Sequence, residues 1–221
     1  QAIDNLAANG TYGTARWSAG TIPATQAIFD HYGYDLKKQG GDIDLVIGGF
    51  EAMDQAVVQE QLDVATGSPM SGAAPDLVAD PPEVALVLQI IEEVKNIGLG
   101  APALNSWACR PSFLESDRAA AEALLSAWEE GVNWFYDDPQ NILSRENHFE
   151  NISVENEEQA QYVYEWGVEN QYDLKEPVAV QDFGWTEEMA SKSRSFLEKS
   201  QELDQLGSGW SDKITYVQDI I

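Results

Sequence analysis

Short apolar runs and helix-spaced apolar positions follow one another along the first third of the chain. The runs have the length and composition of strands and lie at residues 12–16, 43–47 and 61–67. Apolar residues recur at intervals of three and four in the two segments between the runs, 21–33 and 50–60. The order strand, helix, strand, helix, strand predicts a small parallel or mixed sheet with helices packed on it.

The end signals of the first predicted helix agree with its apolar spacing. Thr21 is the expected cap, Pro23 suits the first turn, where a missing N–H group has no cost, and Gly33 is a good terminator. The pattern thus predicts a strand that turns sharply into a helix within the stretch TARWSAGTIPATQAIFDHYG, residues 14–33.

Later in the chain the pattern changes from mixed to helical. The apolar run Val84–Ile90 is typical of a buried strand, and Ala103–Arg110 is a further strand candidate. Helical spacing dominates from Ser116, the expected cap of a long helix in which Trp128 and Trp134 are expected to pack in the core. Two more helices are predicted, at 154–169 and 186–206. The expected fold is therefore α/β with a helical C-terminal half, divided into residues 1–100 and 101–221.

The charge balance is strongly acidic. Against 38 Asp and Glu the chain has only 12 Lys and Arg among its 221 residues, a formal net charge of −26. Such a surface repels nucleic-acid phosphates and anionic lipids, so neither is expected as a partner. The acids are spread through every segment, which predicts a protein adapted to high salt, where counterions screen the repulsion. No apolar run is long enough to cross a membrane, so this segment is not expected to insert in one.

Residue types that carry catalysis or bind metals are few and scattered. Cys109 is the single cysteine, and His31 and His148 are far apart in the sequence, so no metal-ligand spacing is present. With 38 acids, no particular carboxylate pair is singled out as a general acid and base. We therefore expect no catalytic residues, no metal site and no cofactor, and the chain is not expected to be an enzyme.

The turns after the first and third predicted strands are the expected ligand site. Ligands of parallel sheets bind at the carboxyl ends of the strands, and these turns have the sequences WSAGT and TGSPMSG. The two turns supply small residues and hydroxyls, and two tryptophans flank breaks in the pattern and are expected to line a cleft. The expected ligand-binding residues are Trp17, Ser18, Gly20, Thr21, Ser68 and Trp185.

The order of these segments resembles a known transport family. The resemblance is carried by GTARWSAGTIPATQAIFDHYGYDL (13–36), EQLDVATGSP (60–69), SWACRPSFLESDRAAAEALLSAWEEGVNWFYDDPQ (106–140) and GWSDKITYVQDII (209–221). Together they are similar to the ABC-transporter solute-binding proteins of the nitrate, sulfonate and taurine type, a group that includes binders of thiamine precursors. One departure is large, because the usual N-terminal segment of the first lobe is lacking.

The resemblance implies a fold and a function. It implies a periplasmic-binding-protein-like lobe of type 2, with residues 1–100 as the second lobe and 101–221 as the return strand and helical part of the first. It also implies a small solute, here expected to be an organic anion, held in an interlobe cleft and delivered to an ABC-transporter permease. The protein would then be exported and extracellular or attached to the cell surface, with a lipid anchor as one form of attachment.

Two alternatives stay open at this point. One is an enzyme of the same fold, of the type that forms the thiamine pyrimidine; such relatives carry a cysteine-rich metal motif and a donor histidine, which one Cys and two distant His do not match. The other is a surface interaction protein that binds no small ligand.

Overall fold

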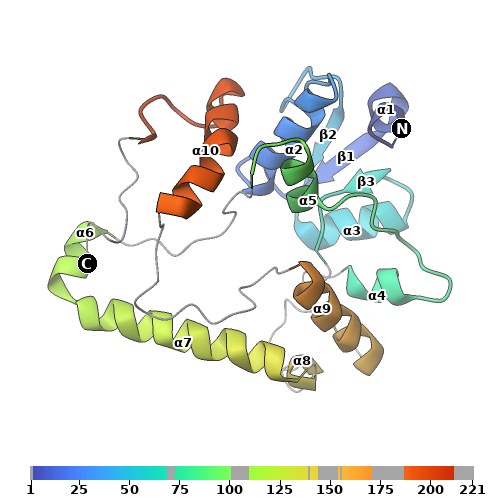
Figure 1. Ribbon diagram of the computed structural model, residues 1–221. Helices are drawn as coiled ribbons and strands as arrows, with labels where there is room; N and C mark the ends of the chain where they lie inside the picture. The colour runs from blue at the N-terminus through green and yellow to red at the C-terminus, as the bar shows by residue number, and fades with distance from the viewer. Residues whose placement is uncertain are drawn as a thin grey trace. The chain divides into compact units, whose positions relative to one another are not determined.

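The computed structural model of the protein describes residues 2–68, 73–100, 110–138, 140–143, 154, 156–170 and 187–211 (Figure 1). Contacts divide the chain into two units that interleave along the sequence. The first unit takes in Gln1–Gly67, Glu83–Asn105 and Trp185–Ile221, and the second takes in Ser68–Pro82 and Ser106–Gly184. The predicted parts, 1–100 and 101–221, were instead two continuous stretches of the chain. The assignment of either part to a lobe of a solute-binding protein stays a prediction.

A small parallel sheet lies in the first unit, as the sequence predicts. Its strands are β1 (Thr11–Thr14), β2 (Asp44–Ile47) and β3 (Val64–Ala65), in the order β2-β1-β3. Both strand pairs are parallel, and Tyr12 lies beside Leu45 on one side and Val64 on the other. The helices of this unit are α1 (Ala2–Asn9), α2 (Thr21–His31), α3 (Phe50–Val58), α5 (Ile90–Asn96) and α10 (Glu187–Glu202).

Alternation along β1 directs successive residues to opposite faces of the sheet. The ring of Tyr12 meets Phe29 of α2 edge to face, with 5.8 Å between ring centroids. On the other face, a Cβ placed on Gly13 would lie 2.9 Å from the sulfur of Met53 in α3. Helices α2 and α3 therefore cover opposite faces, and glycine at position 13 gives α3 room to approach the sheet closely.

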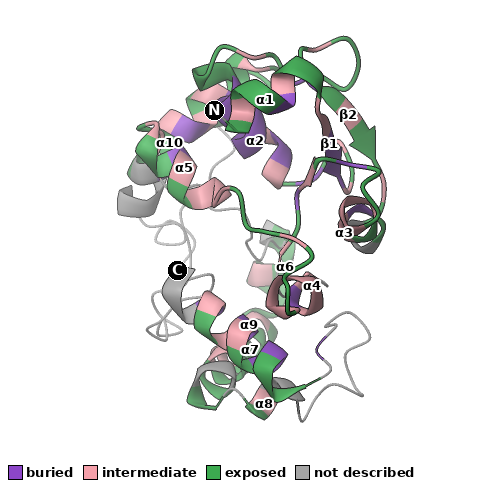
Figure 2. Ribbon diagram, turned by 90° about the vertical axis from the view of Figure 1, so that its right-hand side faces the viewer, coloured by how far each residue is buried: buried purple, intermediate pink, exposed green. Residues whose placement is uncertain are grey.

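Helix α2 joins two apolar clusters of the first unit. Its Phe29 packs with Tyr12 and with residues of α1 and the α2–β2 connection, in a cluster of Leu6, Tyr12, Phe29, Leu36 and Ile43. Its Ala24 and Ile28 pack instead with Val94 of α5 and Phe196 of α10. Figure 2 shows buried residues concentrated along α2, whereas β2 carries exposed ones.

The described elements of the second unit are all helices. They are α4 (Ala74–Val78), α6 (Pro111–Ser116), α7 (Arg118–Asp137), α8 (Gln140–Leu143) and α9 (Glu157–Asn170). Ala74 of α4 packs with Ala160 and Val163 of α9 and with Val154. Helical structure was predicted from the apolar spacing only from Ser116 onward, so α4 and α6 were not predicted.

The structure corrects the prediction of a buried strand at Val84–Ile90. Residues 85–89 form no strand, and Leu86 and Val87 are more than half exposed, at 54% and 58%. Ile90 instead begins α5, and Leu88 and Ile90 pack against the α2–α5–α10 cluster. An apolar run of this length is compatible with a strand or a helix start, and its flanks did not separate the two.

Two further expectations in the helices are corrected, and one strand candidate is not tested. Asp117 caps α7, accepting a hydrogen bond from the N–H group of Ala120, so Ser116 ends α6 and does not cap the long helix. Trp128 and Trp134 are not core residues, because they are 43% and 37% exposed. The strand candidate Ala103–Arg110 falls almost entirely outside the described residues.

Candidate ligand-binding site

The carboxyl ends of the three strands meet at one edge of the sheet, where the strand order reverses. The chain passes from β1 through α2 to β2, which lies on one side of β1. It then passes from β2 through α3 to β3, which lies on the other side of β1. Since α2 and α3 cover opposite faces, β1 lies at the topological switch point of the sheet. In open α/β sheets this point is where a crevice for a ligand forms.

Five hydroxyl groups gather between β1, the first turns of α2 and the end of β3. The phenol oxygen of buried Tyr12 lies 3.3 Å from Oγ1 of Thr25 and also contacts Oγ1 of Thr66. Thr25 donates in turn to the carbonyl oxygen of Thr21, at 2.9 Å. Thr14 lies two residues beyond Tyr12, so its side chain is on the same face of β1, the face that α2 covers. We call these residues the hydroxyl cluster.

Counting hydrogens shows which members of the hydroxyl cluster are still able to donate. A hydroxyl group has one hydrogen. Thr25 uses its hydrogen on the carbonyl of Thr21, so it accepts from Tyr12, and Thr66 must then donate to Tyr12. The Oγ1 atoms of Thr14 and Thr21 are buried and have no hydrogen-bond partner in the described part of the chain. These two hydroxyls are the unused donors of the cluster.

Burial keeps the hydroxyl cluster in its neutral form. Tyr12 is 4% exposed, and its pKa is raised mainly because burial disfavours the charged phenolate, although the hydrogen bonds with Thr25 and Thr66 oppose the shift. Thr14 is fully buried and Thr66 is 6% exposed. The site therefore presents neutral donors and is suited to accept a ligand oxygen.

Residues 15–20 join β1 to α2 and include most of the predicted turn WSAGT (17–21). This segment is closed by hydrogen bonds from the N–H group of Ala19 to the carbonyl of Arg16 and from that of Ile22 to the carbonyl of Ala19, each 3.0 Å. Arg16 and Ser18 are exposed, and Trp17 is half-buried. Because β1 ends at Thr14, Arg16 belongs to the turn and not to a strand.

Gly20 and Thr21 have roles at the start of α2 that differ from those predicted. The N-cap position is Gly20, and no side chain caps the helix, so the prediction of Thr21 as the cap is wrong. Instead its hydroxyl is buried, and its carbonyl oxygen accepts the hydrogen bond from Thr25. Thr21, Gly20, Ser18 and Trp17 are thus brought together, in the turn and at the helix start.

The other two predicted site residues are not placed with them. Ser68 is half-buried and groups with the second unit. Trp185 lies outside the described residues. Their assignment to the ligand site stays a prediction.

Sequence reasoning missed four members of the hydroxyl cluster, Tyr12, Thr14, Thr25 and Thr66. The alternation of β1 carries the first signal, since it puts Tyr12 and Thr14 on one face. Thr25 lies four residues after Thr21, on the same side of the helix. Thr66 ends the third apolar run. What joins them is the pairing of β1 with β3, which brings Thr66 to Tyr12 across 54 residues.

The residues that the structure describes contain no group of three or more His, Cys, Asp and Glu side chains arranged to hold a metal ion. Within the same ranges, no helix has both the length and the apolar character needed to cross a membrane.

Comparison of the chain with protein-family models, with curated proteins and with solved structures finds no significant match. The functional conclusion therefore depends on the geometry of the hydroxyl cluster and on the resemblance of the segments described above.

Proposed function

We propose that this protein binds a small organic anion at the hydroxyl cluster, as a solute-binding protein that delivers it to an ABC importer. The observation that carries the binding proposal is the pair of buried hydroxyls on Thr14 and Thr21, which keep their hydrogens for an acceptor. A buried polar group without a partner costs stability, so a site that retains two of them has a use for them. The importer role is supported by the resemblance alone.

An anion fits this site better than a cation. Each unpaired hydroxyl can donate its hydrogen as well as accept, and the sign of the preference comes from α2, which begins at Thr21 with no side-chain cap and has its positive dipole end there. Arg16 supplies one of few cationic side chains in a chain of net charge −26, and it lies in the segment that joins β1 to α2. A carboxylate or sulfonate would accept from the hydroxyls while its charge is met by the helix end and this guanidinium.

Entry of a ligand requires the two hydroxyls to become accessible, because the Oγ1 atoms of Thr14 and Thr21 are both buried. We propose that the segment 15–20 between β1 and α2 moves to expose them. The segment is short, Arg16 and Ser18 within it are exposed, and two backbone hydrogen bonds hold it.

Thermal unfolding with a panel of small molecules tests the proposal. The panel contains acetate, methanesulfonate, taurine and nitrate, with ethanol and methylammonium as neutral and cationic controls. An anion at 100 times its Kd stabilises the folded state by about 2.7 kcal/mol, which is readily visible as a rise in Tm. We expect a rise with at least one organic anion and a smaller rise in the Thr14→Val variant. A flat response to every anion, or a shift that Thr14→Val leaves unchanged, would contradict the proposal.

A further inference from the structure

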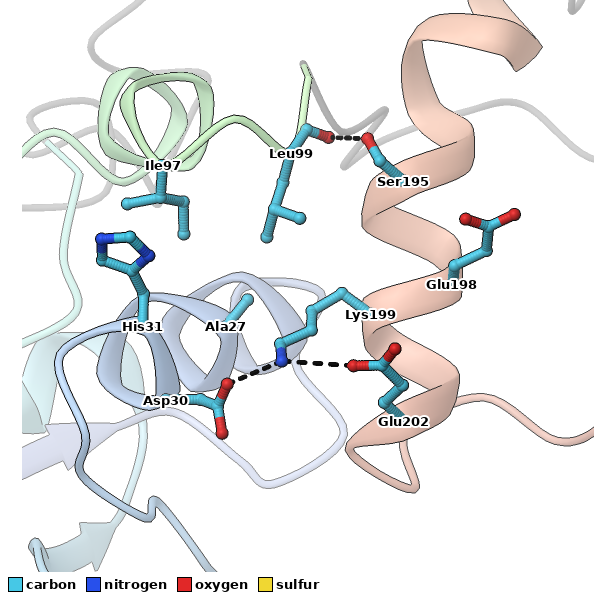
Figure 3. Close-up of a pocket in the computed structure, with 9 residues that line it drawn as sticks. All are labelled: Ala27, Asp30, His31, Ile97, Leu99, Ser195, Glu198, Lys199 and Glu202. Atoms are coloured by element: carbon cyan, nitrogen blue, oxygen red, sulfur yellow. Dashed lines mark hydrogen bonds and ion pairs between the residues drawn. The ribbon is translucent and has the colours of Figure 1, made fainter.

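A hollow lies in the first unit, at the opposite end of α2 from the hydroxyl cluster. It has a volume of about 320 Å³ and opens between α2, the loop after α5, and α10 (Figure 3). Helix α2 contributes Ala27, Asp30 and His31, the loop contributes Ile97 and Leu99, and α10 contributes Ser195, Glu198, Lys199 and Glu202. We call this hollow the α2–α10 pocket.

One wall of the α2–α10 pocket is apolar. Figure 3 shows Ile97 and Leu99 pointing from the loop toward Ala27 of α2. The loop is fixed to α10 by a hydrogen bond of 2.8 Å from Oγ of Ser195 to the carbonyl oxygen of Leu99. The wall is therefore held in place, and an aliphatic chain of a few carbons would lie against it.

The opposite side of the pocket already holds an alkylammonium group, which belongs to the protein. Nζ of Lys199 lies 2.7 Å from Oδ2 of Asp30 and 3.2 Å from Oε2 of Glu202. Its pKa is raised mainly by the hydrogen bond to Asp30, so the group stays charged. Each carboxylate has two oxygens and several acceptor positions, and a single ammonium does not fill them.

Negative charge exceeds positive charge in this pocket. Lys199 pairs with two carboxylates, those of Asp30 and Glu202, while the carboxylate of Glu198, which also lines the pocket, points away from Lys199 in Figure 3. His31 stands in the last turn of α2, where the helix dipole is negative. An anion would be repelled by this balance, whereas a second cation would reduce it. The two ends of α2 thus favour ligands of opposite charge.

We infer that the α2–α10 pocket binds a small aliphatic ammonium ion, with its ammonium group at Asp30 and Glu202 and its carbon chain against Ile97 and Leu99. Lys199 occupies part of the same carboxylate surface and competes with the ligand. The inference concerns a site separate from the hydroxyl cluster, and it does not depend on the anion proposed there.

Calorimetric titration with butylammonium tests the inference at constant ionic strength. Potassium ion is the inorganic arm and 1-butanol is the neutral arm. We expect butylammonium to bind more tightly than both, and more tightly than methylammonium, by up to about fourfold for each CH₂ group fully taken out of water. In Ile97→Ala the gain with chain length should shrink.

Two charge variants with matched controls separate a built site from general attraction to an acidic protein. Lys199→Met removes the internal competitor and should tighten butylammonium binding about two- to fivefold, the range that partly exposed ion pairs span. Lys95→Met, which breaks the pair with Glu92 outside the pocket, should leave binding unchanged. Glu202→Gln should weaken binding by a similar factor, and the exposed Glu83→Gln should not.

Two outcomes would overturn the inference. The first is that butylammonium binds no more tightly than potassium ion or 1-butanol. The second is that Lys199→Met and Lys95→Met change the affinity for butylammonium equally. Circular dichroism of each variant establishes that its fold is retained, and the chain-length series on the unmodified protein decides the matter if a variant does not fold.

Discussion

Replacing Thr14 with valine should make the ligand-free protein more stable. Thr14 is fully buried, and its hydroxyl has no hydrogen-bond partner among the residues described. Valine has nearly the same shape and no hydroxyl, so the packing at the end of β1 is kept and the unpaired polar group is removed. At most sites inside a protein the same change is expected to destabilise, which makes the sign of the effect informative.

The size of the effect follows from the cost of an unsatisfied polar group. A buried donor left without a partner costs about 1–3 kcal/mol. For a chain of this length each kcal/mol corresponds to about 2–4 °C in Tm. Thr14→Val should therefore raise the Tm of the unliganded protein by about 2–12 °C, and it should weaken binding of the proposed anion.

Urea unfolding and calorimetry of the unliganded protein measure this, with Thr25→Val as the matched control. Thr25 belongs to the same cluster, but its hydroxyl is engaged with Tyr12 and Thr21. Its loss should lower the free energy of unfolding by about 0.5–1.5 kcal/mol. If Thr14→Val lowers stability as Thr25→Val does, the Thr14 hydroxyl makes a bond in the folded protein and the donor count of the cluster is wrong.

Four other predictions concern the fold and its charge. Phe196→Ala should lower the free energy of unfolding by about 3–5 kcal/mol, since Phe196 is 7% exposed and joins α10 to α2. Urea unfolding measures this loss, and it would show none if α10 packed elsewhere. Gly41→Ala should cost about 1–3 kcal/mol, because a Cβ there would lie 2.3 Å from the carbonyl oxygen of Asp35, whereas Gly207→Ala, which meets nothing within 4 Å, should be close to neutral in the same assay. The pKa of Asp63 is lowered chiefly by the hydrogen bond from the N–H group of Thr11, so its contribution to stability is present above the unfolded pKa of about 4 and is lost as the pH falls through the lower folded pKa. Asp63→Asn should therefore flatten the fall of Tm on acidification, and an acid profile equal to that of the unmodified protein would contradict this. Finally, added KCl should raise the Tm if the net charge of −26 is a surface adapted to salt, and a Tm independent of KCl would argue against that adaptation.

The edge strand β2 shows where local pattern and structure separate. Val46 and Ile47 are 38% and 41% exposed although the run IDLVI has the composition of a buried strand. A parallel strand is expected to be covered on both faces. Among the described residues, β2 pairs with β1 on one side alone. This follows from the order of the strands in the sheet, which a short stretch of sequence does not reveal.

The apolar spacing of the sequence by itself determined the three strands, the two helices between them and the helical nature of the later chain. Apolar residues recur every two positions in a strand and every three or four in a helix, and this recurrence is a local property of each segment. It also predicted the turn after β1 as the place for a ligand, since strand ends and a helix start are visible in order. Only the tertiary structure decided which side chains form the candidate site. Parallel pairing of β1 with β3 brings Thr66 to Tyr12, and the burial of Thr14 and Thr21 leaves two hydroxyls unpaired. The packing of α10 on α2, across more than 150 residues of sequence, likewise created the pocket around Lys199. Hydrogen-bond satisfaction and charge balance depend on neighbours in space, and the sequence order alone does not specify them.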